Sequence, residues 1–144
     1  MKIRAYLNFD GNAEEALRFY QKVLRGELTE IQRFDSLPEG AGPPLTEEQK
    51  NLVLHVGLDL PNGEMIMASD VVEGMGPPLV AGTNVNLMIN PDSREEAERV
   101  FEELAEGGTI TMPLEMQFWG DLFGGLTDRF GIHWMVNYGE APSQ

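Results

Sequence analysis

Two stretches of the chain show the spacing of apolar residues that is typical of an amphipathic helix. The first helix is predicted to begin after Asn12, which has Glu15 three residues later in capping-box spacing, and to end at Gly26. The second is predicted over residues 93–106, where a serine and a glutamate have the same spacing. The apolar positions are Ala13, Ala16, Leu17, Tyr20 and Leu24 in the first helix, and Ala97, Val100, Phe101 and Leu104 in the second.

Short stretches rich in apolar residues, several of them alternating with polar ones, predict strands in much of the remaining chain. The predicted strands cover residues 3–9, 27–34, 52–60, 64–69, 83–89, 109–114, 121–128 and 132–138. Pro61, Asn62 and Gly63 form a hairpin turn between two of them. Residues 35–51 contain too much proline and glycine for regular structure. A loop of that length is more often functional or mobile than a plain connection.

The order of elements occurs twice. The helices align through a shared Glu-Glu-Ala triplet and through the glycines that end them. When Gly57 is aligned with Gly125, Met67 falls on Met135. Each copy is a strand, a helix and three further strands, and one copy alone would bury too little apolar surface to be stable.

We therefore predict an α+β fold in which two βαβββ repeats form paired curved sheets. The prediction is a single domain over residues 1–144, with repeat one at about residues 1–74 and repeat two at about residues 82–139.

The composition is that of an acidic globular protein. Of 144 residues, 42% are hydrophobic, and 24 acidic residues against 10 basic ones give a net charge of −14. Such a surface repels phosphate backbones and anionic lipids, and no apolar run is long enough to span a bilayer, so neither nucleic acid nor a membrane is an expected partner. The excess charge can attract cationic ligands or simply keep the surface soluble.

Two absences narrow the expected chemistry. The chain has no cysteine, which excludes disulfides, thiolate nucleophiles and thiolate metal ligands. Its first residues alternate at once and lack the apolar block of a signal peptide, so a cytoplasmic location is expected.

Three segments together resemble one protein superfamily. They are AYLNFDGNAEEALRFY at residues 5–20, MIMASD at 65–70 and MPLEMQFWGDLFGGLTDRFGIHWMVN at 112–137. With the duplicated βαβββ order, they are similar to the vicinal oxygen chelate superfamily of glyoxalases, extradiol dioxygenases and fosfomycin and bleomycin resistance proteins. Within it, the chain resembles the PhnB-like branch. This resemblance implies two sheets that close around a ligand cavity, and a homodimer.

The resemblance also implies where a metal would bind. In the metal-dependent enzymes of the superfamily, His, Gln or Glu ligands come from the first and last strands of each repeat, and the open-sided ion polarises the substrate's oxygens. Here the last-strand positions fall on Met67 and Met135. The first-strand positions fall near Arg4 or Ala5 and near Asn84, and a slip of one residue brings Tyr6 or Val85.

None of these residues is a good ligand for a hard divalent ion, so we expect neither a metal site nor another cofactor. The two methionines suit an adaptable apolar cavity floor, although they can equally fill gaps in the core. Some relatives are described as methyltransferases, but the chain has no glycine-rich turn between a strand and a helix to hold a nucleoside-like methyl donor.

The two histidines are the remaining titratable candidates. His55 has apolar neighbours and is the candidate for acid–base chemistry without metal; the alternative is a hydrogen-bonded core imidazole. His133 follows a turn glycine, faces opposite to Trp134 by strand alternation, and is expected at the surface or at an interface. His55 and His133 could also form a metal-binding pair, but two histidines without a third ligand are only a weak signal of a metal site.

The segment around Trp119 is the most distinctive local motif. We expect Phe118 and Trp119 to line the cavity and Asp121 to shape its edge; the alternative is that Asp121 ties a turn and Trp119 packs on a partner subunit. Asp70 and Asp128 are expected to support loop and turn geometry.

The predicted function is that of a small-molecule-binding protein with an apolar cavity and a lost metal site. Its expected ligand-binding residues are Met67, Asn84, Phe118, Trp119, Asp121 and Met135, and residues 35–51 are expected to form a mobile lid over the cavity mouth. The alternative is a metal-dependent lyase, isomerase or dioxygenase with atypical ligands. Whether the protein is an enzyme stays open, with His55 as the candidate catalytic residue.

Overall fold

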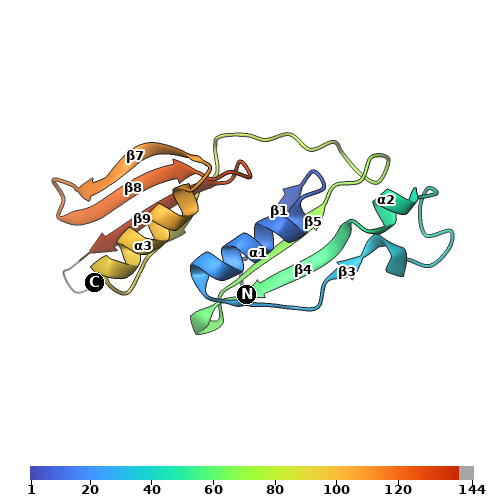
Figure 1. Cartoon of the computed structure of the whole chain (residues 1–144), viewed down its shortest axis with the longest axis horizontal. Helices are drawn as coiled ribbons and strands as arrows, with labels where there is room; N and C mark the ends of the chain where they lie inside the picture. The colour runs from blue at the N-terminus through green and yellow to red at the C-terminus, as the bar shows by residue number, and fades with distance from the viewer. Residues whose placement is uncertain (140–144) are drawn as a thin grey trace. The chain divides into compact units, whose positions relative to one another are not determined.

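The computed structural model describes residues 1–139 and divides the chain into two compact units, residues 1–80 and 81–144. Each unit contains one predicted strand–helix–strand sequence (Figure 1). We call the elements of the first unit repeat one and those of the second repeat two. No helix within the described residues is long and apolar enough to cross a membrane.

Repeat one forms a mixed sheet with its helix on one face. Its elements are β1 (Ala5–Phe9), α1 (Ala13–Leu24), β2 (Glu27–Leu28), β3 (Gln32–Arg33), the 3₁₀ turn η1 (Phe34–Ser36), α2 (Glu47–Lys50), β4 (Val53–Asp59), the 3₁₀ turn η2 (Pro61–Gly63) and β5 (Met65–Asp70). The sheet order is β1-β5-β4-β2, with β3 also on β4. Strand β1 runs parallel to β5, and β4 antiparallel to it.

Repeat two has the same topology. Its elements are β6 (Leu87–Ile89), α3 (Arg94–Ala105), β7 (Thr109–Met116), β8 (Asp121–Thr127) and β9 (His133–Gly139). The order β6-β9-β8-β7 again places the first strand parallel to the last. The two sheets therefore confirm the duplicated βαβββ prediction. Whether they close around a cavity stays a prediction.

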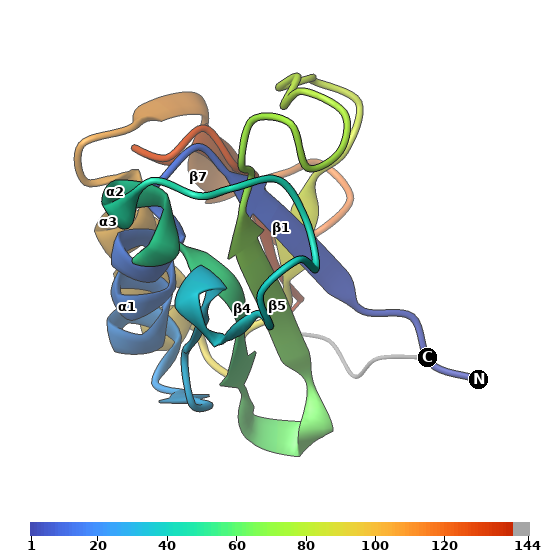
Figure 2. The ribbon, with the colours of Figure 1, turned by 90° about the vertical axis from the view of Figure 1, so that its right-hand side faces the viewer.

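In each repeat the core lies between the helix and one face of the sheet. In repeat one Leu17 and Tyr20 of α1 are fully buried, as are Val56 and Leu58 of β4. Figure 2 shows α1 on one side of β4 and β5. Strand alternation leaves a second face on each sheet, opposite the helix, which we call the helix-free face.

The predicted helices are confirmed, but the residues that cap their ends differ from those expected for α1. Asn12 occupies the N-cap position of α1 without a side-chain cap, whereas Ser93 accepts a hydrogen bond from the backbone N–H of Glu96 in α3. At the other end of α1 the left-handed residue is Arg25, with φ 55°. Gly26 is required for another reason: a Cβ there would lie 2.5 Å from the carbonyl oxygen of Asp59.

Three strand and loop predictions need correction. The strand expected over residues 27–34 is broken into β2 and β3. The break begins at Thr29, opposite Gly57: its backbone N–H still donates to the carbonyl of Gly57, but its hydroxyl, not its carbonyl, accepts from the N–H of Gly57. Strand β6 begins only at Leu87. Residues 35–51 are not wholly irregular, since they contain α2, where Thr46 and Gln49 form a reciprocal capping box.

Candidate functional site

The helix-free face of repeat one carries a row of polar side chains next to a methionine. The β1–β5 register places Tyr6 beside Met67 and Asn8 beside Ser69. His55 on β4 lies next to Ser69, because Val56 pairs with Ala68. Tyr6 is 44% exposed and Asn8 is exposed, whereas His55, Met67 and Ser69 are half-buried.

Two hydrogen bonds join these side chains. The hydroxyl of Tyr6 lies 3.2 Å from Nδ1 of His55, with the ring centroids 5.7 Å apart. Strand β5 separates β1 from β4, so this bond passes over β5. The hydroxyl of Ser69 donates to Oδ1 of Asn8 at 3.3 Å. His55 is therefore neither buried in the core nor isolated, but lies among polar side chains on the sheet surface. We call Tyr6, Asn8, His55 and Ser69 the polar cluster.

The centre of the helix-free face of repeat two is apolar. The register pairs Met88 with Met135, and Gly125 lies beside Met135 on the next strand. Phe123 on β8 occupies the position that His55 occupies in repeat one. Repeat two therefore presents a methionine row where repeat one presents a tyrosine, a methionine and a histidine.

The aromatic motif lies at the turn between β7 and β8. Phe118 is 98% exposed and Trp119 is 51% exposed, and their rings meet edge to face at 5.0 Å. Trp119 also contacts Phe123, with ring centroids 5.9 Å apart. Asp121, the first residue of β8, accepts a hydrogen bond from Nδ2 of Asn137 at 3.1 Å. Trp119 therefore contacts Phe123, a residue of β8 that lies on the helix-free face.

Asn84 does not lie where the sequence placed it. It is exposed, in the segment before β6, and Met88 takes the position beside Met135. The strand expected over residues 83–89 begins only at Leu87, so Asn84 lies before the strand. The expected first-strand positions near Arg4 or Ala5 and near Asn84 are therefore corrected to Tyr6 and Met88.

His133 is held on both ring nitrogens. Its Nδ1 lies 2.9 Å from the hydroxyl of Thr127, and its Nε2 lies 2.9 Å from the carbonyl oxygen of Gly82. Because a carbonyl only accepts, Nε2 carries the hydrogen and donates. His133 therefore ties the segment before β6 to strands β8 and β9. His55 and His133 belong to different units.

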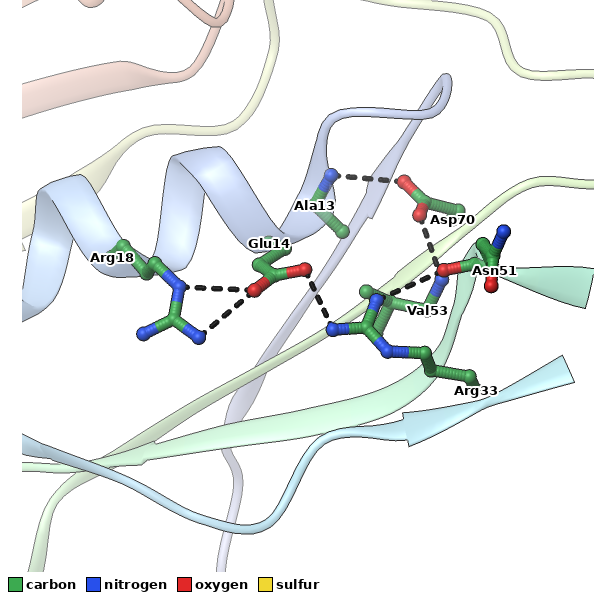
Figure 3. A network of polar contacts seen from close by, with 7 residues as sticks. All are labelled: Ala13, Glu14, Arg18, Arg33, Asn51, Val53 and Asp70. Carbon is green, nitrogen blue, oxygen red and sulfur yellow. Dashed lines mark hydrogen bonds and ion pairs between the residues drawn. The ribbon is translucent and has the colours of Figure 1, made fainter. Parts of the chain in front are cut away.

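Two buried aspartates prove to be structural. Asp70 accepts hydrogen bonds from the backbone N–H of Ala13 at 2.9 Å and of Val53 at 2.8 Å (Figure 3). Asp128 accepts from the backbone N–H groups of Phe130 and Ile132 and from the indole of Trp134. The expectation that both carboxylates support loop and turn geometry is confirmed.

A charged network closes the base of the loop over residues 35–51. Arg33 donates to the carbonyl oxygen of Asn51 and to the carboxylate of Glu14, which also pairs with Arg18 (Figure 3). The hydrogen bond from Arg33, and then that from Arg18, lower the pKa of Glu14 below its ordinary value of 4.5. The two ends of the loop are thereby fixed, while its action as a lid stays a prediction.

The last-strand positions at which the resemblance places metal ligands hold Met67 and Met135, and the register places Tyr6 and Met88 beside them. These residues do not suit a hard divalent ion. Thioethers are soft ligands, and a phenol is a poor one unless it loses its proton. Among residues 1–139, no group of three or more His, Cys, Asp or Glu side chains is placed to hold a metal ion.

A family model described as 3-demethylubiquinone-9 3-methyltransferase matches residues 1–137. The chain belongs to this family. It is 37% identical to the protein PA1353 from Pseudomonas aeruginosa, with 96% of this chain and 98% of that chain covered and a TM-score of 0.82.

Two further solved structures support the assignment. A PhnB protein from Bacillus cereus, described as a putative 3-demethylubiquinone-9 3-methyltransferase, is 28% identical with a TM-score of 0.70, and the match covers 96% of this chain and all of that one. A glyoxylase/bleomycin resistance protein/dioxygenase domain from Frankia is 15% identical with a TM-score of 0.66, over 97% of this chain and 98% of that one, and shows the fold alone.

Asn8 and Ser69 are the members of the polar cluster that the sequence did not single out for function, and Tyr6 was named only as a one-residue slip of an expected metal-ligand position. A signal for Asn8 existed, because Tyr6 and Asn8 alternate with apolar residues in a predicted strand and therefore share a face. Their connection with His55 depends on the order of three strands and was not visible in the sequence.

Proposed function

We propose that this protein binds small organic molecules on the helix-free face of an individual sheet, without the metal ion used by enzymes of the superfamily that it resembles. The observation that carries the proposal is the strand register. It places Met67 beside Tyr6 and Met135 beside Met88. At Met67 and Met135, the resemblance to the superfamily implies metal ligands such as His, Gln or Glu. Methionine side chains are flexible and polarizable, so they adapt to the shape of an apolar ligand.

The exposure of these faces agrees with a binding role. Met88 and Trp119 are about half exposed, and Met112 on β7 is 44% exposed. Large apolar side chains on a surface often mark a binding site, because leaving them in water costs free energy. Phe118, Trp119 and Asp121 are the residues of repeat two that we expect to contact the ligand together with Met135.

The name of the matching family suggests a methyltransferase, but the turns of this chain do not favour that chemistry. A nucleoside-like methyl donor is usually held by a glycine-rich turn between a strand and a helix. Here the turns are Asp10-Gly11-Asn12 before α1 and residues 90–93, which include Pro91, before α3. Neither has the repeated glycines that let a backbone approach a cofactor closely.

The proposal is tested with protein whose eight methionines carry ¹³C-labelled methyl groups. A library of aromatic and aliphatic fragments is titrated while the methyl signals are recorded. We expect saturable shifts of the Met67 and Met135 signals and none of Met1, which is fully exposed at the N-terminus and serves as the internal control. Shifts that are equal at all methionines would show non-specific association and contradict the proposal.

A metal measurement separates this proposal from the metal-dependent alternative. The protein is purified without added metal or chelator, and divalent metals are quantified per chain. The proposal expects substoichiometric metal, unchanged between the wild type and a His55→Ala variant. A tightly bound divalent metal at one per chain that is lost in the variant would overturn it.

A further inference from the structure

Two internal hydrogen bonds orient the side chains of the polar cluster of repeat one. They leave two hydrogen-bond donors, on Asn8 and His55, without a partner among residues 1–139. Ser69 donates to Oδ1 of Asn8, so the amide nitrogen of Asn8 has no partner among residues 1–139. The Tyr6 hydroxyl is hydrogen-bonded to Nδ1 of His55, and Nε2 of His55 has no hydrogen-bond partner among residues 1–139. When the hydroxyl donates to Nδ1, the ring hydrogen stands on Nε2, which then donates outward.

The strand order brings these donors towards the same place. Asn8 on β1 and His55 on β4 flank Ser69 on the central strand β5. Each side chain leans over β5, because Asn8 bonds Ser69 and His55 bonds Tyr6 across it. The cluster is therefore a short polar row beside Met67.

Repeat two shows that the fold does not require this cluster. At the positions of Tyr6 and His55 it has Met88 and Phe123. Its amide that corresponds to Asn8 is Asn90, whose Nδ2 is already bonded to the backbone carbonyl of Asn137 at 3.2 Å. An apolar residue is thus compatible with both strand positions, and the free donors are a property of repeat one alone.

The two donors, and not the charges of this face, indicate a carboxylate. Arg4 and Asp59 lie at the same end of the face, because the guanidinium of Arg4 is 3.5 Å from the sulfur of Met65 and Asp59 pairs with Met65. Each is four residues from Asn8 or His55, or roughly 13 Å along an extended strand, so the opposite charges offset each other at the cluster. Two donors that approach the same place match the two acceptor oxygens of a carboxylate.

We propose that Asn8 and His55, with Tyr6 holding the His55 ring, bind the carboxylate group of a small organic acid on the helix-free face of repeat one. The proposal rests on the small-molecule-binding function above and names the class of ligand. Nε2 of His55 and Nδ2 of Asn8 donate to the carboxylate oxygens, and the carbon skeleton of the acid lies on Met67.

The test compares acids with matched neutral compounds on the full chain. Benzoate and hexanoate are titrated in parallel with benzyl alcohol and 1-hexanol, and the signals of the His55 ring, the Asn8 amide and the Met67 methyl group are followed by NMR. We expect the acids to shift all three signals saturably and to bind at least about tenfold more tightly than the alcohols, which corresponds to about 1.4 kcal/mol.

Two variants copy the residues of repeat two and so keep the fold. His55→Phe and Tyr6→Met place on repeat one the residues found at the corresponding positions, and Asn90→Ala in repeat two is the control. We expect His55→Phe to abolish the preference for acids, Tyr6→Met to weaken it, and Asn90→Ala to leave it unchanged. The amide dispersion of each variant checks that it is folded.

Three results would overturn the carboxylate site. In the first, alcohols bind as tightly as acids at His55 and Asn8. In the second, His55→Phe is folded and retains the preference. In the third, none of the acids shifts these signals up to roughly 10 mM, the limit of a weak but specific contact. Fragments that still shift Met67 or Met135 in those cases would leave the small-molecule-binding proposal intact, which separates the two failures.

Discussion

The carboxylate of Asp70, at the end of β5, accepts a hydrogen bond from the backbone N–H of Ala13, the first residue of α1, at 2.9 Å. Its other oxygen accepts from the backbone N–H of Val53 at the start of β4. One buried side chain thus caps a helix and joins it to two strands, in the place where Asn12 makes no side-chain cap (Figure 3).

Replacing Asp70 by alanine is therefore expected to lower the free energy of unfolding by about 3 kcal/mol, because two buried N–H groups lose their acceptor. Asp70→Asn is expected to lose less, since an amide oxygen can still accept one of the two bonds. Urea unfolding followed by circular dichroism measures both. The exposed Asp10 provides the control, and Asp10→Ala should change stability by less than about 0.5 kcal/mol. Equal losses at the two positions would contradict the capping role.

This cap illustrates what the sequence could and could not predict. Helical periodicity identified both helices, because the pattern is local and the buried faces are continuous. The helix cap was assigned to Asn12 because a sequence shows only neighbouring candidates, whereas Asp70 approaches through the sheet. The same limit hid the bond between Tyr6 and His55, which needs three strands in a particular order.

The repeats were predicted more accurately than their registers. Glycines and methionines at matching positions were enough to detect the duplication. The first-strand position expected at Asn84 falls on Met88, because β6 begins only at Leu87 and pairs Met88 with Met135. A pairing register depends on cross-strand contacts, and a slip of one residue turns every side chain to the other face.

Asp128 is expected to be as important to repeat two as Asp70 is to repeat one. Its carboxylate accepts from the indole Nε1 of Trp134 at 2.8 Å and from two backbone N–H groups of the turn before β9. Asp128→Ala should lower the free energy of unfolding by about 3 kcal/mol. It should also change the fluorescence of Trp134, measured in a Trp119→Phe background so that Trp134 is the only indole.

The exposed Asp92 offers a matched control for this experiment, since it precedes α3 and its side chain is in solvent. Asp92→Ala should leave both the emission and the stability close to those of the parent. An unchanged Trp134 spectrum in a folded Asp128→Ala protein would show that the carboxylate does not determine the environment of the indole.

Glu14 should make stability depend on pH in the acid range. Its pKa is lowered, first by the hydrogen bond from Arg33 and then by that from Arg18. A lowered pKa in the folded state contributes stability that is present above the ordinary value of 4.5 and is lost as the pH falls through the folded-state pKa. Because the carboxylate is about one-third exposed, the contribution should be no more than about 1 kcal/mol.

The measurement is urea unfolding at a series of pH values between about 3 and 7, comparing the wild type with Glu14→Gln. We expect the two proteins to differ most at neutral pH and to converge in acid. Glu15→Gln is the matched control, because Glu15 is the exposed neighbour on the same helix, and it should give a curve parallel to the wild type. A difference between wild type and Glu14→Gln that stays constant down to pH 3 would exclude the proposed linkage.

Replacement by alanine should destabilise the protein much more at Gly124 than at the adjacent Gly125 of β8. A Cβ at Gly124 would lie 2.8 Å from the ring of Phe101 on α3 and 2.9 Å from the backbone of Leu114, so the helix and β7 would both have to move. A Cβ at Gly125 would point to the helix-free face, where the closest atom is the hydroxyl of Thr111 at 3.2 Å, a side chain that can rotate. We expect Gly124→Ala to lower the free energy of unfolding by about 2 kcal/mol and Gly125→Ala to change it by less than about 1 kcal/mol. Chemical unfolding of the two variants in parallel measures the difference. Equal losses of unfolding free energy would mean that the packing of α3 on the sheet is not the reason why residue 124 must be glycine.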